Sequence, residues 1–217
     1  MLTLAVDTTA DCGSVALADA TGVREEILVE APRGFSQVLF GEIEALLGRQ
    51  RLKLADIGLF AGASGPGSFT GVRVGLAAMK GLAETLGKPA LAVSNLDALR
   101  AWGSGRRRAV VIDAHRGEVF AALFDAAGEP LIGESVMPLE RFRAMLGDAP
   151  VEWISQEDAV LAQCPAHATV VRAPKGLAGE IARLAMVRLP HAATSDPVAI
   201  EANYVRRSDA EIFWKED

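Results

Sequence analysis

The apolar and polar positions of the chain follow one pattern twice. Each copy reads as an apolar strand, a polar turn opened by aspartate, a second apolar strand and a turn of the form Asp-x-x-Gly. The first copy covers residues 4–22 and the second covers residues 111–128. Aligned without a gap, they match at three polar positions: Asp7, Asp19 and Gly22 correspond to Asp113, Asp125 and Gly128. Chance similarity between two hydrophobic hairpins explains part of this match, but the three fixed positions favour a duplication.

Helical and strand periodicity alternates after each hairpin. In the first half we expect a strand at 24–29, a helix over 34–48 that Ser36 caps, a strand at 57–62, a helix over 70–87, a strand at 89–93 and a short helix from Ser94 to Trp102. In the second half we expect a helix over 139–146, short buried strands at 151–155 and 169–172, and a helix over 176–189. This order predicts an α/β fold: a duplicated βββαβαβα architecture of the actin type. Gly103-Ser-Gly is the best linker, so the expected subdomains are 1–103 and 104–217.

A glycine-rich segment, Ser64–Gly75, joins the expected strand at 57–62 to the following helix. Free backbone N–H groups at a helix start suit a phosphate or carboxylate, and glycine lets the backbone come close to it. The alternative is a tight turn capped by Ser68 or Thr70, whose glycines serve packing, and the spacing favours that turn. The segment lacks the Gly-Lys-Ser/Thr ending of a P-loop and the glycine spacing of a dinucleotide fingerprint.

Three glycines, Gly71, Gly75 and Gly81, continue into the helix beside Ala77 and Ala78. Glycine in a helix interior costs about 1 kcal/mol relative to alanine. These residues make a thin helix whose surface another backbone can approach closely. The approaching backbone belongs either to the core of this chain or to a partner, and spacing does not separate the two.

Composition narrows the possible functions. Half of the 217 residues are hydrophobic, 23% are charged and the net charge is −6, which argues against a protein that grips nucleic acid by itself. The basic run Arg106-Arg107-Arg108 is interpreted as a solvated loop. The apolar run at the N-terminus is interrupted by Asp7 and is read as a buried strand, not a signal peptide, and no stretch has the length of a membrane span. Two distant cysteines fit a reducing cytosol, and three scattered histidines offer no metal site.

Four motifs together resemble one known family. They are Leu4-Ala-Val-Asp-Thr-Thr9, Gly65-Pro-Gly-Ser-Phe-Thr-Gly-Val-Arg-Val-Gly75, Asp113-Ala-His-Arg-Gly-Glu-Val119 and Tyr204-Val-Arg206. In this order and spacing they are similar to those of the bacterial TsaB (YeaZ) proteins, over nearly the whole chain. The glycine segment is the specific motif among them.

The resemblance implies a non-catalytic partner and activator of TsaD in making N6-threonylcarbamoyladenosine (t6A) at position 37 of tRNAs that read codons starting with A. It implies a TsaD heterodimer, TsaE in a larger complex, a homodimer when alone, tRNA only through the complex, and a cytoplasmic location. In the family, the helices over 35–47 and 71–86 meet the partner. The corresponding interface residues here are Phe35, Val38, Leu39, Glu42, Ile43, Gly71, Val72, Gly75, Leu76, Ala78, Met79 and Leu82.

This chain departs from the family pattern at two positions. Phe35 stands where members usually carry histidine, and Ala202 stands where they carry proline. TsaD relatives use a histidine pair on the first helix for metal, so Phe35 removes any remnant of that site. We therefore expect no metal and no cofactor.

The two turns opened by aspartate are where nucleotide binding or catalysis would be expected. Actin-like ATPases hold phosphates with two such hairpins. Here Asp7-Thr8-Thr9 forms a vestigial nucleotide turn, whose hydroxyls could reach a phosphate. The second turn places bulky His115 and Arg116 where close backbone approach is needed. We expect no catalytic residues. The alternatives are a small-molecule kinase or ATPase with Asp7 or Asp113 as general base, and a glycoprotease-type peptidase, as an older label for the group suggests.

Overall fold

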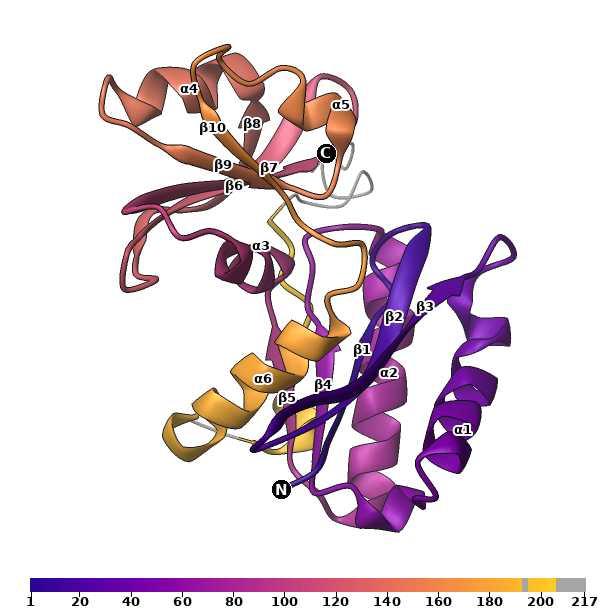
Figure 1. Ribbon diagram of the computed structural model, residues 1–217. Coiled ribbons are helices and arrows are strands. Elements are labelled where there is room, and N and C mark those ends of the chain that lie inside the picture. Colours follow the sequence, from indigo (N-terminus) through magenta and orange to yellow (C-terminus); the bar gives the residue numbers. More distant parts are fainter. Residues whose placement is uncertain (193–194, 206–217) are drawn as a thin grey trace, which may run out of the picture. The chain divides into compact units, whose positions relative to one another are not determined.

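The computed structural model describes residues 1–192 and 195–205, which form two compact units. Unit 1 contains Met1–Ala98 and Pro174–Ala202, and unit 2 contains Leu99–Ala173 and the segment that begins at Asn203. Each unit is built on one five-stranded mixed sheet (Figure 1). The Arg206 end of the Tyr204-Val-Arg206 motif lies outside the described residues.

The sheet of unit 1 has the strand order β3-β2-β1-β4-β5. Its strands are β1 (Thr3–Asp7), β2 (Cys12–Asp19), β3 (Gly22–Glu30), β4 (Leu59–Ala63) and β5 (Ala90–Val93). β1 pairs antiparallel with β2 and parallel with β4, and β4 pairs parallel with β5. The helices are α1 (Leu39–Arg49), α2 (Phe69–Leu86), α3 (Asn95–Leu99) and α6 (Ala178–Arg188), with 3-10 turns at Phe35–Gln37, Leu54–Asp56, Leu189–His191 and Pro197–Ala199.

The sheet of unit 2 repeats this topology in the order β8-β7-β6-β9-β10. Its strands are β6 (Arg107–Asp113), β7 (Glu118–Asp125), β8 (Pro130–Pro138), β9 (Glu152–Ser155) and β10 (Thr169–Arg172), its helices are α4 (Leu139–Leu146) and α5 (Asp158–Leu161), and Arg100–Trp102 is a 3-10 turn. The paired aspartates of the sequence repeat end corresponding strands: Asp7 ends β1 as Asp113 ends β6, and Asp19 ends β2 as Asp125 ends β7. The duplicated actin-like fold is confirmed.

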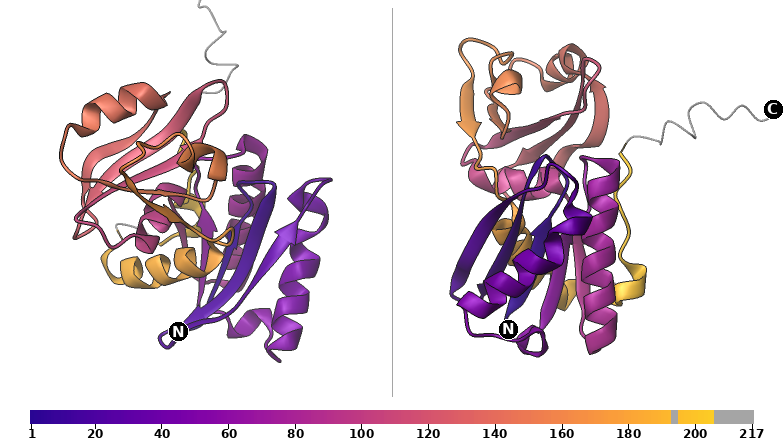
Figure 2. Two further views of the ribbon diagram at one scale, coloured as in Figure 1. Left: turned by 45° about the horizontal axis from the view of Figure 1, so that its top comes forward. Right: turned by 90° about the vertical axis from the view of Figure 1, so that its right-hand side faces the viewer.

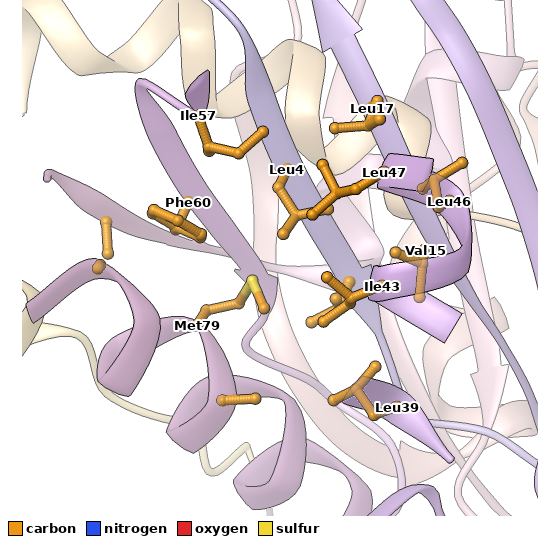
Figure 3. Packing of buried hydrophobic residues seen from close by; sticks show 14 of the residues in the cluster. Leu4, Val15, Leu17, Leu39, Ile43, Leu46, Leu47, Ile57, Phe60 and Met79 are labelled. Atoms are coloured by element: carbon orange, nitrogen blue, oxygen red, sulfur yellow. The ribbon is translucent and has the colours of Figure 1, made fainter. Parts of the chain in front are cut away.

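The core of unit 1 lies between its sheet and the helix pair α1 and α2 (Figure 3). Leu4 of β1, Ile43 of α1 and Met79 of α2 meet there and are buried. Side chains alternate between the two faces of a strand, so the residues on either side of Leu4 in β1 point to the other face of the sheet, which α6 covers (Figure 2).

The predicted boundary at residue 103 is wrong for the segment 174–202, which belongs to unit 1. Its helix α6 packs against β1, β2 and β4. The hydroxyl oxygen of Ser14 on β2 accepts hydrogen bonds from the N–H groups of Leu177 and Ala178, at 3.1 and 3.0 Å. A carboxylate oxygen of Glu26 accepts one from Gly179. The open face of the first sheet buries the apolar side of α6, and each fully buried Ile or Leu contributes about 1.5–3 kcal/mol.

Two smaller expectations also fail. Ser36 does not cap α1, which begins at Leu39 with Val38 at the N-cap and no side-chain cap. The burial of Phe35 draws residues 35–37 into a separate 3-10 turn before the helix. The predicted buried strand at 169–172 exists as β10, but it is mostly exposed because it forms the edge of its sheet.

The basic run is not a solvated loop, because Arg107 and Arg108 belong to β6. Arg108 is buried, and its guanidinium donates hydrogen bonds to the carbonyls of Asp125 and Ala126 at 2.5 and 3.0 Å. Burial lowers the pKa of Arg108, and the nearby charge of Arg100 lowers it further. Arg107 donates to the carbonyl of Leu146 at the end of α4. Only Arg106 is exposed.

Candidate functional site

The turn after β1 is a closed hydrogen-bonded unit. Asp7, Thr8 and Thr9 are all buried. One carboxylate oxygen of Asp7 accepts hydrogen bonds from the N–H group and the hydroxyl of Thr9, at 2.9 and 2.6 Å. The hydroxyl of Thr8 donates to the carbonyl of Gly71 at 2.7 Å. The two hydroxyls that the sequence offers to a phosphate therefore bond inside unit 1.

The glycine segment packs on this turn. Ser68 caps α2 by accepting from the N–H of Gly71, and its own N–H donates to the carbonyl of Thr9 at 2.7 Å. A Cβ atom added to Gly67 would lie 2.6 Å from the Thr9 carbonyl oxygen, and one added to Gly71 would strike the Thr8 carbonyl oxygen. The space that these glycines leave is filled by the backbone of the turn. The turn interpretation describes this segment, with Ser68 as the cap.

Asn95, at the start of α3, joins the Asp7 turn to the glycine segment. Its amide nitrogen donates to the hydroxyl of Thr9 at 2.7 Å, and its amide oxygen accepts from the N–H of Gly65 at 3.1 Å. Sequence reasoning treated Asn95 only as part of a helix start. The available signal was its position directly after β5, since β1, β4 and β5 are parallel and end at the same edge of the sheet.

Burial raises the pKa of the Asp7 carboxyl above its usual range, while the bonds from Thr9 and Asn95 oppose this shift. The negative charge of Glu26 adds slightly to the rise. A buried carboxyl with a raised pKa is often a catalytic group. Here the carboxyl is hydrogen-bonded to Thr9 and Asn95 of the same unit, which suits a structural role.

Phe35 closes the other side of the turn. It is buried, and its ring atoms lie 2.7 and 2.8 Å from the position that a Cβ atom on Gly13 would take. The ring thus occupies the space beside the end of β1. Among residues 1–192 and 195–205, no three His, Cys, Asp or Glu side chains gather as they would around a metal ion.

The turn after β6 is open by comparison. The Asp113 side chain is 44% exposed and accepts a hydrogen bond from the N–H of His115. His115 and Arg116 both have positive φ, 59° and 58°, a conformation that non-glycine residues rarely adopt. The N–H of Asp113 donates to a carboxylate oxygen of Glu157 at 2.6 Å. Burial raises the pKa of Glu157, and the charge of Asp113 raises it further.

Comparison with known protein families identifies the group to which the chain belongs. The family model of TsaD, described as tRNA N6-adenosine threonylcarbamoyltransferase, matches residues 27–212. The chain belongs to this family. Within it, the relatives place the chain in the TsaB (YeaZ) group.

Two curated relatives and one solved structure illustrate the match. The t6A biosynthesis protein TsaB of Escherichia coli is 36% identical over 126 residues, 56% of this chain and 54% of that protein. That alignment spans about half of the relative's length. TsaB of Bacillus subtilis is 28% identical over 100% of this chain and 99% of the relative. The structure of YeaZ from Pseudomonas aeruginosa superposes with a TM-score of 0.79 at 27% identity, covering 94% of this chain and 99% of that one.

The structure divides the interface residues expected from the TsaB resemblance. Val38, Glu42 and Leu82 are half-buried. The other nine are buried within unit 1: Phe35, Leu39, Ile43, Gly71, Val72, Gly75, Leu76, Ala78 and Met79. A Cβ atom on Gly75 would strike the Thr8 hydroxyl oxygen. These nine therefore support the helix pair from beneath and do not form its outer face.

The outer face of the helix pair carries other residues. On α1 they include Phe40, Glu44 and Ala45, and on α2 they include Arg73, Ala77 and Gly81. The small residues of the thin helix therefore lie on two sides: Gly71, Gly75 and Ala78 face inward, while Ala77 and Gly81 are exposed. None of the helices in the described part of the chain is long and apolar enough to cross a membrane.

Proposed function

We propose that this chain is a non-catalytic partner of a TsaD-type enzyme in t6A formation on tRNA. Its family membership and the full-length similarity to TsaB of Bacillus subtilis support this role. Association with TsaE, self-association in the absence of TsaD, and contact with tRNA only through the complex extend the proposal. The net charge of −6 supports the last point, because tRNA binding needs clustered positive charge.

The closed turn after β1 carries the non-catalytic part of the proposal. A phosphate-binding turn must offer free hydroxyls or N–H groups and room for the backbone to approach. Here the hydroxyls of Thr8 and Thr9 bond to Gly71 and Asp7, and the space around Gly67 and Gly71 is filled. The kinase and peptidase alternatives gain no support from this turn.

The outer face of α1 and α2 is the proposed docking surface. Both helices are fixed to the sheet by the apolar cluster beneath them, so the face is held in one shape (Figure 3). Ala77 and Gly81 present almost no side chain, which allows a partner helix to approach α2 closely. The half-buried Val38, Glu42 and Leu82 lie between this face and the core, and they belong to the proposed surface.

Reconstitution tests the role. A TsaD-family enzyme is assayed for t6A formation on tRNA with this chain, without it, and with the variant Ala77→Trp. We expect the wild-type chain to raise the rate at least tenfold and Ala77→Trp to remove most of that gain. Ala20→Trp, which enlarges an exposed alanine in the β2–β3 turn, is the matched control and should behave as wild type.

Assays of the chain by itself test the non-catalytic part. We expect its ATP hydrolysis and peptidase activity to stay at background. Turnover that disappears in Asp7→Ala or Asp113→Ala would show instead that one of the aspartate turns is catalytic.

A further inference from the structure

We infer that residues 206–217, which we call the tail, dock into an apolar groove on unit 2 of the same chain. The inference is independent of the proposed function, which uses neither the groove nor the tail. The chemistry of the groove, the sequence of the tail and the point where the described chain leaves unit 2 together support it.

The groove lies at one end of the sheet of unit 2, where β6, β8, β9 and β10 begin. Its volume is about 550 Å³, and most of its wall is apolar. The apolar side chains and the two exposed-side cations of the wall are Leu131, Ala149, Pro150, Val151, Arg106 and Arg107. Leu131 is 53% exposed, so a segment that covers it would remove apolar area from water.

Hydrogen bonds hold the walls of the groove in place. Arg107 donates to the carbonyls of Leu146 and Ala149, at 2.9 and 3.2 Å, which ties the segment after α4 to the start of β6. Glu152, at the start of β9, accepts from two N–H groups of the linker before β6, at 2.7 and 2.8 Å. The groove is therefore formed before anything binds, and an occupant loses little free energy in ordering it.

Arginines give the groove a positive side. Arg106 is exposed, and Arg107 bonds to neutral carbonyls that leave its charge in place. The two carboxylates of the wall, Asp125 and Glu152, already accept from backbone N–H groups, and their charges favour the charged form of the buried Arg108. The groove therefore favours an occupant that combines apolar and acidic side chains.

The sequence of the tail has this combination. Its centre is the apolar run Ile212-Phe213-Trp214, which contains the one adjacent pair of aromatic residues in the chain. Four carboxylates and one ammonium flank this run between residues 208 and 217, and the two arginines of the tail stand apart at its start. Aromatic side chains carry much of the energy of binding interfaces, and the carboxylates are complementary to the arginines of the groove.

The chain leaves unit 2 close to the groove. The amide nitrogen of Asn203 donates to a carboxylate oxygen of Glu134 on β8, at 2.5 Å. Leu131 lies three residues earlier on the same strand, about 10 Å along it. Six residues, 206–211, separate the last described residue from the apolar run of the tail, and they span up to about 20 Å when extended. The run can therefore reach the groove.

The tail of the same chain is the favoured occupant of this groove. A short linker gives a tethered segment an effective concentration in the millimolar range, so even weak affinity fills the site. The hollow of unit 1 beside the end of α2 suits the tail less well. Two carboxylates, those of Glu84 and Asp196, line that hollow with Lys88, and they would repel an acidic segment.

Fluorine NMR of the full chain labelled with 5-fluorotryptophan tests the docking. Trp214→Phe assigns the Trp214 signal, and the signal of Trp153, which is buried in unit 2, verifies that each variant is folded. We expect the Trp214 signal to differ from that of a synthetic peptide of residues 206–217. Leu131→Asp in the groove and Phe213→Ser in the tail should each lower the docked fraction about tenfold and move the signal toward the peptide position.

Two further variants separate the groove from its surroundings. Val170→Asp is the matched control for Leu131→Asp, because Val170 is also exposed but points to the opposite face of β10 from Thr169, which lines the groove. It should leave the Trp214 signal unchanged. Arg106→Met should lower the docked fraction about threefold and weaken its dependence on salt.

Three results would overturn the inference. A Trp214 signal of the wild-type chain at the peptide position would show that the tail is not docked. A signal that Leu131→Asp and Phe213→Ser leave unchanged would show that the tail contacts another surface. A shifted signal that returns to the peptide position on dilution would show that the tail of a second copy fills the groove.

Discussion

Units 1 and 2 have the same strand order but hold the ends of their strands in different ways. In unit 1, the long helix α2 follows β4 and packs on the Asp7 turn through glycines. In unit 2, the corresponding helix α5 has only four residues, and at the matching turn a carboxylate oxygen of Glu157, which precedes α5, accepts from the N–H of Asp113. At the opposite ends of β6 and β9, Arg108 donates to four carbonyls, and Glu152 accepts from the N–H groups of Ser104 and Gly105. The same strand order is thus compatible with different contacts at the strand ends. The unit with the long helix carries the proposed docking face.

Among the substitutions considered, Gly71→Ala is expected to have the largest effect, a loss of stability in unit 1. The new methyl group strikes the carbonyl oxygen of Thr8, so α2 must move away from the turn at a cost of about 3 kcal/mol. Gly81→Ala is the matched control on the same helix, because no atom lies within 4 Å of its added Cβ. That change should stabilise unit 1 by about 1 kcal/mol.

Hydrogen exchange of β1 and α2 measures both changes, since the stretches Met1–Ala98 and Pro174–Ala202 of unit 1 contain no tryptophan. Similar protection in Gly71→Ala and Gly81→Ala would show that the close contact between α2 and the turn is unimportant.

Arg108→Met should destabilise unit 2 by about 2 kcal/mol. The substitution keeps an apolar stem of similar length but leaves partly buried acceptors, including the carbonyls of Asp125 and Ala126, without their charged donor. Arg106→Met, two residues earlier, is the control and should change stability by less than about 0.5 kcal/mol. Fluorescence of Trp153, which is buried in the core of unit 2, follows urea unfolding of this unit. Equal losses in the two variants would mean that Arg108 adds nothing through its buried position.

The buried carboxyls of the two units should give the smallest effect, seen as pH dependence. The pKa of Asp7 in unit 1 and that of Glu157 in unit 2 are both raised by burial. A raised pKa means that the folded state binds the proton more tightly than the unfolded chain. The protonated carboxyl therefore contributes to folding stability in full below the pKa of the unfolded chain, about 4. This contribution is lost as pH rises through the pKa of the folded state.

Asp7→Asn and Glu157→Gln remove these ionisations. Relative to wild type, each variant should gain stability as pH rises above about 4, and Asp7→Asn should gain more because Asp7 is the more deeply buried. Unfolding free energy measured from pH 4 to 7 tests this. A wild-type stability that rises with pH relative to Asp7→Asn would contradict the direction of the Asp7 shift.

The duplicated fold and most of its elements could be predicted from local patterns in the sequence. Strand alternation, the repeated Asp-x-x-Gly turns and the helical spacing of apolar residues are local signals, so β1 to β5, α2 and α4 were predicted to within a few residues. Ser68, one of the two expected caps together with Thr70, is confirmed, because capping depends on a few neighbouring residues. The family could be identified because its motifs are short runs in fixed order.

Tertiary structure decided which residues are buried and where the units divide. Gly75 and Gly81 look alike in the sequence, but they lie on opposite sides of α2, and only contact with Thr8 makes one of them internal. Arg106 is exposed and Arg108 is buried, although both belong to the same basic run. The guanidinium of Arg108 bonds to carbonyls such as that of Asp125. Helix α6 belongs to unit 1. Ser14 and Glu26, more than 150 residues earlier in the chain, accept hydrogen bonds from the N–H groups at its start. Such long-range partners leave no trace in local periodicity.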